Sequence, residues 1–178
     1  MPPSGPEERL SATADERLPI VVVSDAGPLI ALGRLDLLHV LQHLFAQVQV
    51  PDEVILECMA RPGNADTVRI RAALDSGLLF RCMAPPLEIA GLEVGECAAI
   101  SRALEIGAAM LVDERAARAR AVALGIVVTG TLGVLARARR RGLIGPLMPL
   151  ITTLRASGQR LSHQAVAQAL AASGEAFE

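Results

Sequence analysis

Three acidic side chains stand at positions from which they could act together. Asp25 directly follows the strand expected at residues 20–24, and Asp113 follows a second apolar run at residues 109–112. Glu96 lies 17 residues before Asp113, one turn inside an expected helix. Because the carboxyl ends of parallel strands meet at one edge of a sheet, where ligands bind in open α/β folds, the three carboxylates are expected to converge there.

This convergence favours a bound cation, because several carboxylates in one crevice do not all stay ionised cheaply without one. Oxygen-only ligation suits Mg²⁺ or Mn²⁺, whereas zinc prefers His and Cys. Such ions activate water and stabilise the leaving oxygen in phosphodiester hydrolysis. Simpler interpretations stay open: Asp25 and Asp113 could each cap the following helix, and Glu96 could be a first-turn acid favoured by the helix dipole.

The pattern of apolar residues predicts an α/β fold. Strands are expected at residues 20–24, 47–50, 78–83, 109–112 and 126–128. Helices are expected at residues 28–44, 52–60, 67–76, 93–106, 114–124, 131–141, 146–156 and 162–172. The alternation of strand and helix predicts a parallel sheet of four to five strands sandwiched between helices.

The chain is expected to form one domain. Residues 1–19 are rich in Pro, Glu, Ser and Ala without periodicity, which predicts a disordered leader. Residues 20–175 would then form a single domain that includes two C-terminal helices. No uncharged apolar run reaches the roughly 18 residues of a membrane span, and the N-terminus lacks the pattern of a secretory signal. We therefore expect a cytoplasmic protein without a membrane segment. Three cysteines without CxxC spacing favour neither a zinc site nor a disulfide framework.

Charge is divided unevenly along the chain. Residues 1–114 hold 17 acids and 8 arginines, whereas residues 115–174 hold 9 arginines and no acid. This asymmetry suggests an acidic site beside a basic face, suited to a metal-assisted reaction on a polyanion. Alternatively, the two surfaces could pair within a dimer.

Two groups of arginines are candidates for contacts with a nucleic-acid backbone. Arg115 and Arg118 lie one helical turn apart near Asp113 and could contact phosphate or pair with nearby acids. The best candidate patch for a nucleic-acid backbone is the run Arg137, Arg139, Arg140 and Arg141. A solvated helix end, favoured by the dipole, explains that run nearly as well.

Five motifs in order resemble a PIN domain, and specifically the VapC-like toxins of bacterial toxin–antitoxin pairs. The motifs occupy residues 22–32, 50–58, 92–100, 110–118 and 130–135. The resemblance implies a doubly wound PIN-like fold and a Mg²⁺- or Mn²⁺-dependent endoribonuclease whose substrate is RNA. It also implies a homodimer that is inhibited by a small antitoxin protein.

The resemblance places Asp25, Glu96 and Asp113 on the metal-binding acids of the family. Glu57 falls on a helix position that is often acidic and near the site, although a solvated helix acid explains it equally well. The family often has an acid or polar residue after the last strand, where this chain has no carboxylate in residues 129–131. There Thr131 could supply a hydroxyl through water or cap its helix.

Two further expectations depend on these positions. Ser24 could hydrogen-bond a site acid or be purely structural. The missing carboxylate leaves a second function open besides the ribonuclease, namely a catalytically inactive PIN-like regulatory module that binds RNA or a protein partner.

Overall fold

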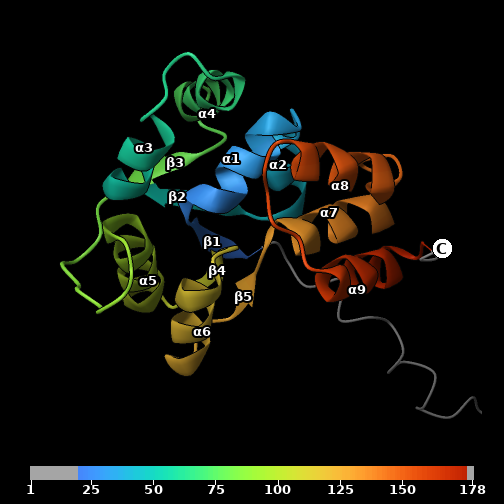
Figure 1. Cartoon of the computed structure of the whole chain (residues 1–178). Helices are drawn as coiled ribbons and strands as arrows, with labels where there is room; N and C mark the ends of the chain where they lie inside the picture. The colour runs from blue at the N-terminus through green and yellow to red at the C-terminus, as the bar shows by residue number, and fades with distance from the viewer. Residues whose placement is uncertain (1–19, 176–178) are drawn as a thin grey trace, which may run out of the picture.

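The structure is a computed structural model that describes residues 20–175 (Figure 1). The leader expected at residues 1–19 lies outside the described residues. The strands are β1 (Val21–Ser24), β2 (Gln47–Pro51), β3 (Phe80–Cys82), β4 (Ala109–Leu111) and β5 (Val128–Thr129). The helices are α1 (Ala26–Arg34), the 3₁₀ helix η2 (Leu38–Val40), α2 (Leu41–Leu44), α3 (Asp52–Cys58), α4 (Ala65–Asp75), α5 (Val94–Ile106), α6 (Arg115–Ala123), α7 (Thr131–Arg140), α8 (Leu147–Ala156) and α9 (His163–Ser173).

The strands form one five-stranded parallel sheet in the order β3-β2-β1-β4-β5. Its centre is β1, where Val22 and Val23 are fully buried, as a β-branched run between two parallel neighbours should be. The chain winds outward from β1 through β2 to β3 and then returns to the other side of β1 with β4. The winding direction therefore changes between β1 and β4, which is where open α/β sheets bind ligands. The expected fold class is confirmed.

The single helix expected at residues 28–44 is wrong. The chain instead forms α1, a turn, η2 and α2, with Asp36 in the left-handed region at φ +59°. Asp is one of the few side chains that tolerates this conformation. Arg69 of α4 stabilises the break, because its guanidinium donates to the carbonyl oxygen of Gly33 at 2.8 Å and pairs with Asp36 at 3.1 Å. The leucine spacing continues across the break because each piece buries its own apolar face.

Helices cover both faces of the sheet. Figure 1 shows α5 and α6 at the lower left of the strands and α1, α2 and α7 at their upper right. One continuous core joins these layers, and its largest fully buried side chains include Leu29, Leu32, Ile100, Met110 and Leu111. None of the helices in the described residues is long and apolar enough to cross a membrane.

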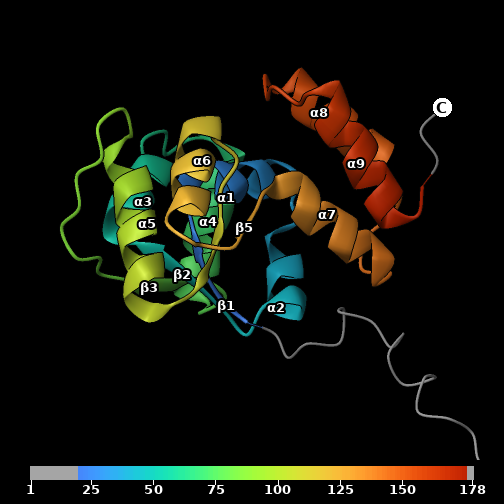
Figure 2. The same cartoon turned by 90° about the horizontal axis from the view of Figure 1, so that it is seen from below.

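The last three helices form a group of their own beside the sheet. Helices α8 and α9 pack on α7, and α7 in turn packs on α1 and α2 (Figures 1 and 2). Glu175 links all three helices, because its carboxylate pairs with Arg139 at 2.8 Å and accepts a hydrogen bond from the backbone nitrogen of Leu147 at 3.1 Å. The two C-terminal helices expected from the sequence are thus held against the rest of the fold.

Candidate active site

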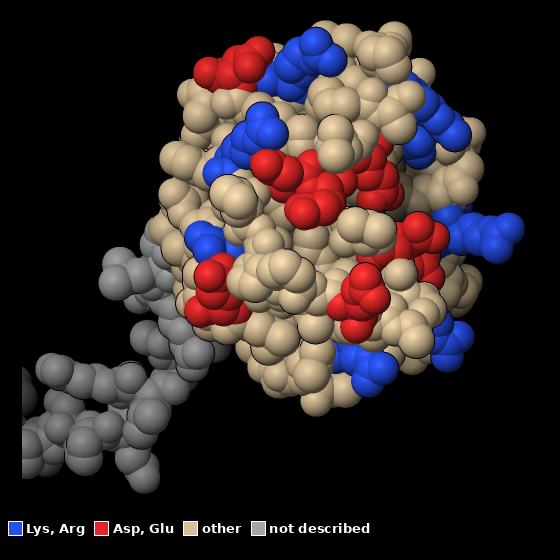
Figure 3. Space-filling model, turned by 90° about the vertical axis from the view of Figure 1, so that its left-hand side faces the viewer, with Lys and Arg blue, Asp and Glu red and all other residues tan. Residues whose placement is uncertain are grey.

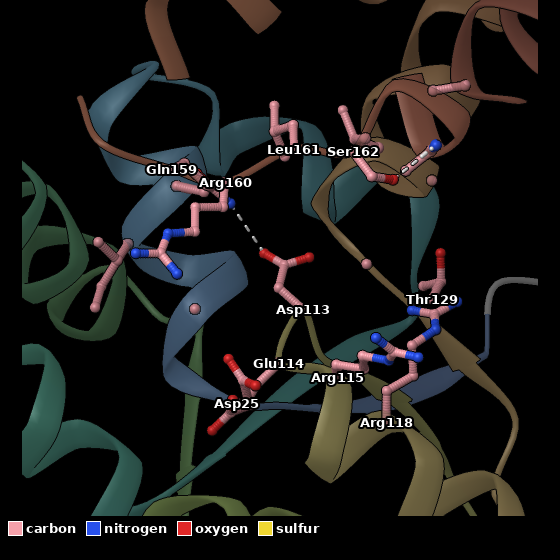
Figure 4. A pocket seen from close by; sticks show the side chains of 18 of the residues that line it. Asp25, Asp113, Glu114, Arg115, Arg118, Thr129, Gln159, Arg160, Leu161 and Ser162 are labelled. Carbon is pink, nitrogen blue, oxygen red and sulfur yellow. Dashed lines mark hydrogen bonds between the residues drawn. The ribbon is translucent and has the colours of Figure 1, made fainter. Parts of the chain in front are cut away.

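The carboxyl ends of β1 and β4 bring Asp25 and Asp113 to the same edge of the sheet. The backbone N–H of Asp25 donates to the carbonyl oxygen of Leu111 at 2.9 Å, and Val112 donates to Thr129 at 2.9 Å. These bonds continue the strand ladder to the edge of the sheet. Both aspartates line an open cleft of about 1210 Å³ (Figure 4).

The cleft is lined by carboxylates from four separate parts of the chain. They belong to Asp25, Glu57, Glu93, Glu96, Asp113 and Glu114. The structure therefore brings together all three acids selected as metal ligands, and also Glu57. Acidic side chains also gather across the middle of the face that lies at the left of Figure 1, with basic side chains spread around them (Figure 3).

Asp25 is the most deeply buried of the three selected acids. Its exposed fraction is 5%, and its Oδ1 atom has no hydrogen-bond partner in the structure. The pKa of Asp25 is raised to about 7, mainly by burial. A hydrogen bond with the backbone of Ala26 lowers this pKa, whereas the negative charges of Glu57, Glu96 and Asp113 add to the increase. Although Asp25 sits at the cap position of α1, its side chain makes no capping hydrogen bond. The capping interpretation of Asp25 is therefore wrong.

Asp113 is held by the first residue of α7. Its Oδ1 accepts from the backbone nitrogen of Thr131 at 2.7 Å, and its Oδ2 accepts from the Thr131 hydroxyl at 2.5 Å. A carboxylate at this position is favoured by the dipole of α7. Gly130 allows the approach, because a Cβ there would lie 2.6 Å from Oδ1.

Two sequence interpretations are corrected by this contact. Asp113 does not cap α6, because Glu114 occupies that cap position, and it stabilises the start of α7 instead. Thr131 does not cap its own helix, because Gly130 is the cap residue and the buried Thr131 hydroxyl donates directly to Asp113.

Glu96 and Glu57 face each other from α5 and α3. Glu96 is 7% exposed, and its Oε2 accepts from the backbone nitrogen of Glu93 at 2.8 Å, which confirms its first-turn role. Burial raises the pKa of Glu57, and the negative charges of Glu96 and Glu93 add to the effect. Gly95 permits the close contact of the two helices, because a Cβ there would lie 2.9 Å from Glu57 Oε2.

The donor set fits a hard divalent cation in its chemistry. All the candidate ligands are carboxylates, the oxygen donors that Mg²⁺ and Mn²⁺ accept, and Asp25 contributes an oxygen that lacks any other partner. Within residues 20–175, no three His, Cys, Asp or Glu side chains already converge as closely as the ligands of one ion. Two of the carboxylates, on Glu96 and Asp113, accept hydrogen bonds from backbone donors of their own.

The remaining selected residues fall into two groups. Ser24 is structural, because its buried hydroxyl donates to the backbone carbonyl oxygen of Asp25 at 2.9 Å and to no site carboxylate. Arg115 and Arg118 do line the cleft, and Arg118 also donates to the carbonyl oxygen of Val112 at 3.2 Å.

The four-arginine run at the end of α7 does not line this cleft. Arg139 pairs with Glu175 at 2.8 Å, and Arg141 donates to the carbonyl oxygen of His43 at 2.7 Å. A role for Arg137 and Arg140 in RNA binding stays a prediction, as it does for Arg139 and Arg141.

Several residues that line the cleft were not predicted from the sequence, namely Arg34, Glu93, Glu114, Gln159 and Arg160. Glu93 had a usable signal, because it lies three residues before Glu96 in the spacing of a capping box. Gln159 and Arg160 had none, because they lie in a connection between two helices where no motif stands out. All three cysteines are free, as expected.

Comparison with known proteins gives the family. One solved structure similar to this chain is a PilT N-terminus domain protein, SSO1118, from the hyperthermophilic archaeon Sulfolobus solfataricus P2. It is 15% identical, with a TM-score of 0.47 over 81% of this chain and 98% of that chain. No curated protein matches this chain in sequence. The family model DUF3368, described as a PIN domain, matches residues 21–175. The chain therefore belongs to the PIN-domain family, whose members are generally nucleases.

Proposed function

We propose that this PIN domain is a Mg²⁺- or Mn²⁺-dependent endoribonuclease in which Asp25, Glu96 and Asp113 hold the metal. The observation that carries the proposal is the buried, unpaired Oδ1 of Asp25, with the charges of Glu57, Glu96 and Asp113 close enough to raise its pKa. A buried polar atom without a partner is costly, and a cation beside several carboxylates removes that cost. Membership of a family that typically binds divalent metals adds support.

Each residue has a definite role in this proposal. When bound, the divalent ion supplies an activated water and stabilises charge on the leaving oxygen of the phosphodiester. Asp25 provides a fixed anionic oxygen at the sheet edge, and Thr131 holds the carboxylate of Asp113 from two donors. Arg115 and Arg118 place positive charge in the same cleft for the RNA backbone. No side-chain nucleophile is needed.

The experiment that tests the proposal is cleavage of a mixed RNA pool with Mg²⁺ or Mn²⁺ and with EDTA. Wild-type protein is compared with Asp25→Asn and with Asp36→Asn, a control that removes an exposed acid outside the cleft. We expect metal-dependent cleavage that Asp25→Asn abolishes and Asp36→Asn preserves. Cleavage that survives Asp25→Asn contradicts the site assignment.

The finer biological proposal is that the enzyme is the toxin of a toxin–antitoxin pair, acts in the cytoplasm as a homodimer and is inhibited by a small antitoxin. It is supported by the five-motif resemblance to VapC-like toxins. Induced expression should arrest growth, and co-expression of a small neighbouring gene product should restore it. Light scattering should give twice the mass of one chain, whereas a monomer that leaves growth unaffected contradicts this proposal.

A second candidate, an inactive PIN-like module, is favoured by one specific observation. After β5 the chain offers Thr131 in place of a carboxylate, and its hydroxyl is already bound to Asp113. Calorimetric titration of the purified protein with millimolar Mg²⁺ or Mn²⁺ separates the two functions. Heat of binding that Asp25→Asn removes supports the enzyme, and a flat titration for the wild-type protein supports the inactive module.

A further inference from the structure

The cleft has a second wall that belongs to no strand of the sheet. Residues Gly158–Ser162 join α8 to α9 and line the cleft across from Asp25 (Figure 4). We infer that this segment is the RNA-binding wall of the active site, in which Arg160 binds a backbone phosphate and Gln159 positions Asp113. This inference rests on the proposed ribonuclease function and deepens it.

The backbone of the segment is set by the end of α8. Gly158 adopts φ +90°, its N–H donates to the carbonyl oxygen of Arg155 at 3.0 Å, and the N–H of Gln159 donates to Leu154 at 3.1 Å. This pair of bonds is a Schellman motif, in which glycine takes the left-handed position after the helix. The helix end therefore fixes where the side chain of Gln159 begins.

The segment is also tied to the rest of the molecule on both sides. Arg34 of α1 donates to the carbonyl oxygen of Ser157 at 3.3 Å, just before the segment. Ser162 ends the segment and caps α9, because its Oγ accepts from the backbone nitrogen of Ala165 at 3.1 Å. Anchors at both ends mean that little conformational entropy remains to be lost when the wall binds a ligand.

Gln159 connects this wall to the acids of the sheet edge. Its Nε2 donates to Oδ2 of Asp113 at 3.3 Å, and Figure 4 shows the Asp113 carboxylate turned toward the segment. Asp113 thus receives donors from Thr131 on one side and from Gln159 on the other. Donors on two sides hold the plane of a carboxylate in one orientation, as outer partners do for ligands of metal sites.

Arg160 supplies the positive charge of this wall. It is exposed at the cleft and makes no hydrogen bond or ion pair with any other side chain or backbone group in residues 20–175. A cleft lined by six carboxylates would repel the phosphates of RNA unless cations also faced it. The guanidinium of Arg160 has no protein partner and lies on the wall that faces the acids. Its forked N–H groups are therefore available to bind a phosphate in the geometry that Arg prefers.

The test of Arg160 is binding of a fluorescent single-stranded RNA in EDTA, which measures affinity without metal or cleavage. Arg160→Ala is compared with Arg155→Ala, an exposed arginine in the last turn of α8 that does not line the cleft. We expect Arg160→Ala to raise the Kd about 5- to 10-fold and to reduce the slope of log Kd against log salt by about 0.7, because one phosphate contact is lost. Equal Kd values for the two variants overturn the role of Arg160.

The test of Gln159 compares kcat and KM for Gln159→Ala and Gln159→Glu. Gln164→Glu, on the exposed side of α9 and outside the cleft, is the charge-matched control. We expect Gln159→Ala to lower kcat about tenfold with little change in KM, and Gln159→Glu to lower it further because an acceptor then faces Asp113. A packing role alone predicts the reverse order, because glutamate keeps the volume of glutamine, and that order overturns the positioning role.

Failure of this inference is distinguishable from failure of the proposed function. Wild-type protein that neither binds nor cuts RNA contradicts both. Wild-type protein that binds and cuts RNA, while Arg160→Ala and Gln159→Ala behave like their controls, contradicts the RNA-binding wall alone.

Discussion

The two walls of the cleft are built from different kinds of structure. The strand-end wall carries Asp25 and Asp113 on backbone that is bonded into the sheet, and Ser24 beneath it is fully buried. The helical wall, which is the segment Gly158–Ser162, carries Gln159 and Arg160 on a short connection between helices, half-buried and exposed respectively. The acids are thus held by the sheet itself, whereas the connection between α8 and α9 can change without disturbing the sheet.

The largest expected effect lies in the strand-end wall. Asp113→Asn keeps the size of the side chain but removes a negative charge from the proposed metal site, so a metal-stabilised reaction loses several kcal/mol. We expect cleavage of RNA to fall by about three orders of magnitude. Single-turnover rates in Mg²⁺ measure the effect. The control is Arg155→Ala, in the last turn of α8 and outside the cleft, whose cleavage rate should match that of wild type. A loss smaller than tenfold would falsify the catalytic role of this aspartate.

A smaller loss is expected from the residue that supports Asp113. Thr131→Val keeps the shape of a fully buried side chain and removes the hydroxyl that donates to Asp113 Oδ2, while the backbone donor to Oδ1 remains. We expect cleavage to fall about 10- to 100-fold, the range found when outer partners of metal ligands are removed. Circular dichroism checks that the fold is retained. If Thr131→Ser does not restore more activity than Thr131→Val, the hydroxyl is not what supports the site.

The sequence predicts the strand-end wall well for a physical reason. A buried parallel strand leaves a continuous apolar run, so the acid that follows it, such as Asp25 or Asp113, marks the sheet edge without knowledge of the tertiary structure. Glu96 follows from the local start of its helix. The hydrogen bond between Asp113 and Thr131 could not be predicted from the local sequence, because it joins the ends of two strands and its residues are 18 positions apart in the chain.

The helical wall was not predictable, because its position depends on how α8 and α9 pack on α7. Gly158 indicates a helix end in the sequence, but nothing local shows that the next two residues face the acids. The broken helix at Asp36 is a similar case. Its leucine spacing is continuous, and the break is stabilised by Arg69 from a distant helix.

Asp25 should also make the stability of the fold depend on pH. The native pKa of Asp25, about 7, exceeds its ordinary value of 3.8, so the native state holds this proton more tightly than the unfolded chain does. Its contribution to stability is therefore present at low pH and is lost as the pH rises toward 7. The side chain of Asp25→Asn cannot ionise. Without metal, the free energy of unfolding of this variant should therefore rise by roughly 2 kcal/mol relative to that of wild type as the pH increases from 5 to 8.

Urea unfolding in EDTA at the two pH values measures this difference. The control is Asp36→Asn, which removes an exposed acid outside the cleft and should differ from wild type by the same amount at both values. Added Mn²⁺ should stabilise wild type more than Asp25→Asn, because only wild type retains the full set of carboxylates. If the stability of Asp25→Asn relative to wild type is independent of pH, the native pKa of Asp25 is not raised by burial.

The smallest expected effect concerns the packing of α8 and α9, the two helices that the helical wall connects. Glu175→Gln weakens the pair with Arg139 and the bond to the backbone nitrogen of Leu147 at the start of α8, but it keeps the shape of the side chain. We expect the free energy of unfolding to fall by about 1 kcal/mol, because the pair is partly exposed and screened by water. Thermal melts at low and high salt measure this loss, which should shrink as salt increases. Cleavage per folded molecule should stay close to wild type, because the strand-end wall is untouched. A large loss of cleavage without loss of stability would instead mean that the two walls are coupled through the packing of α8 and α9.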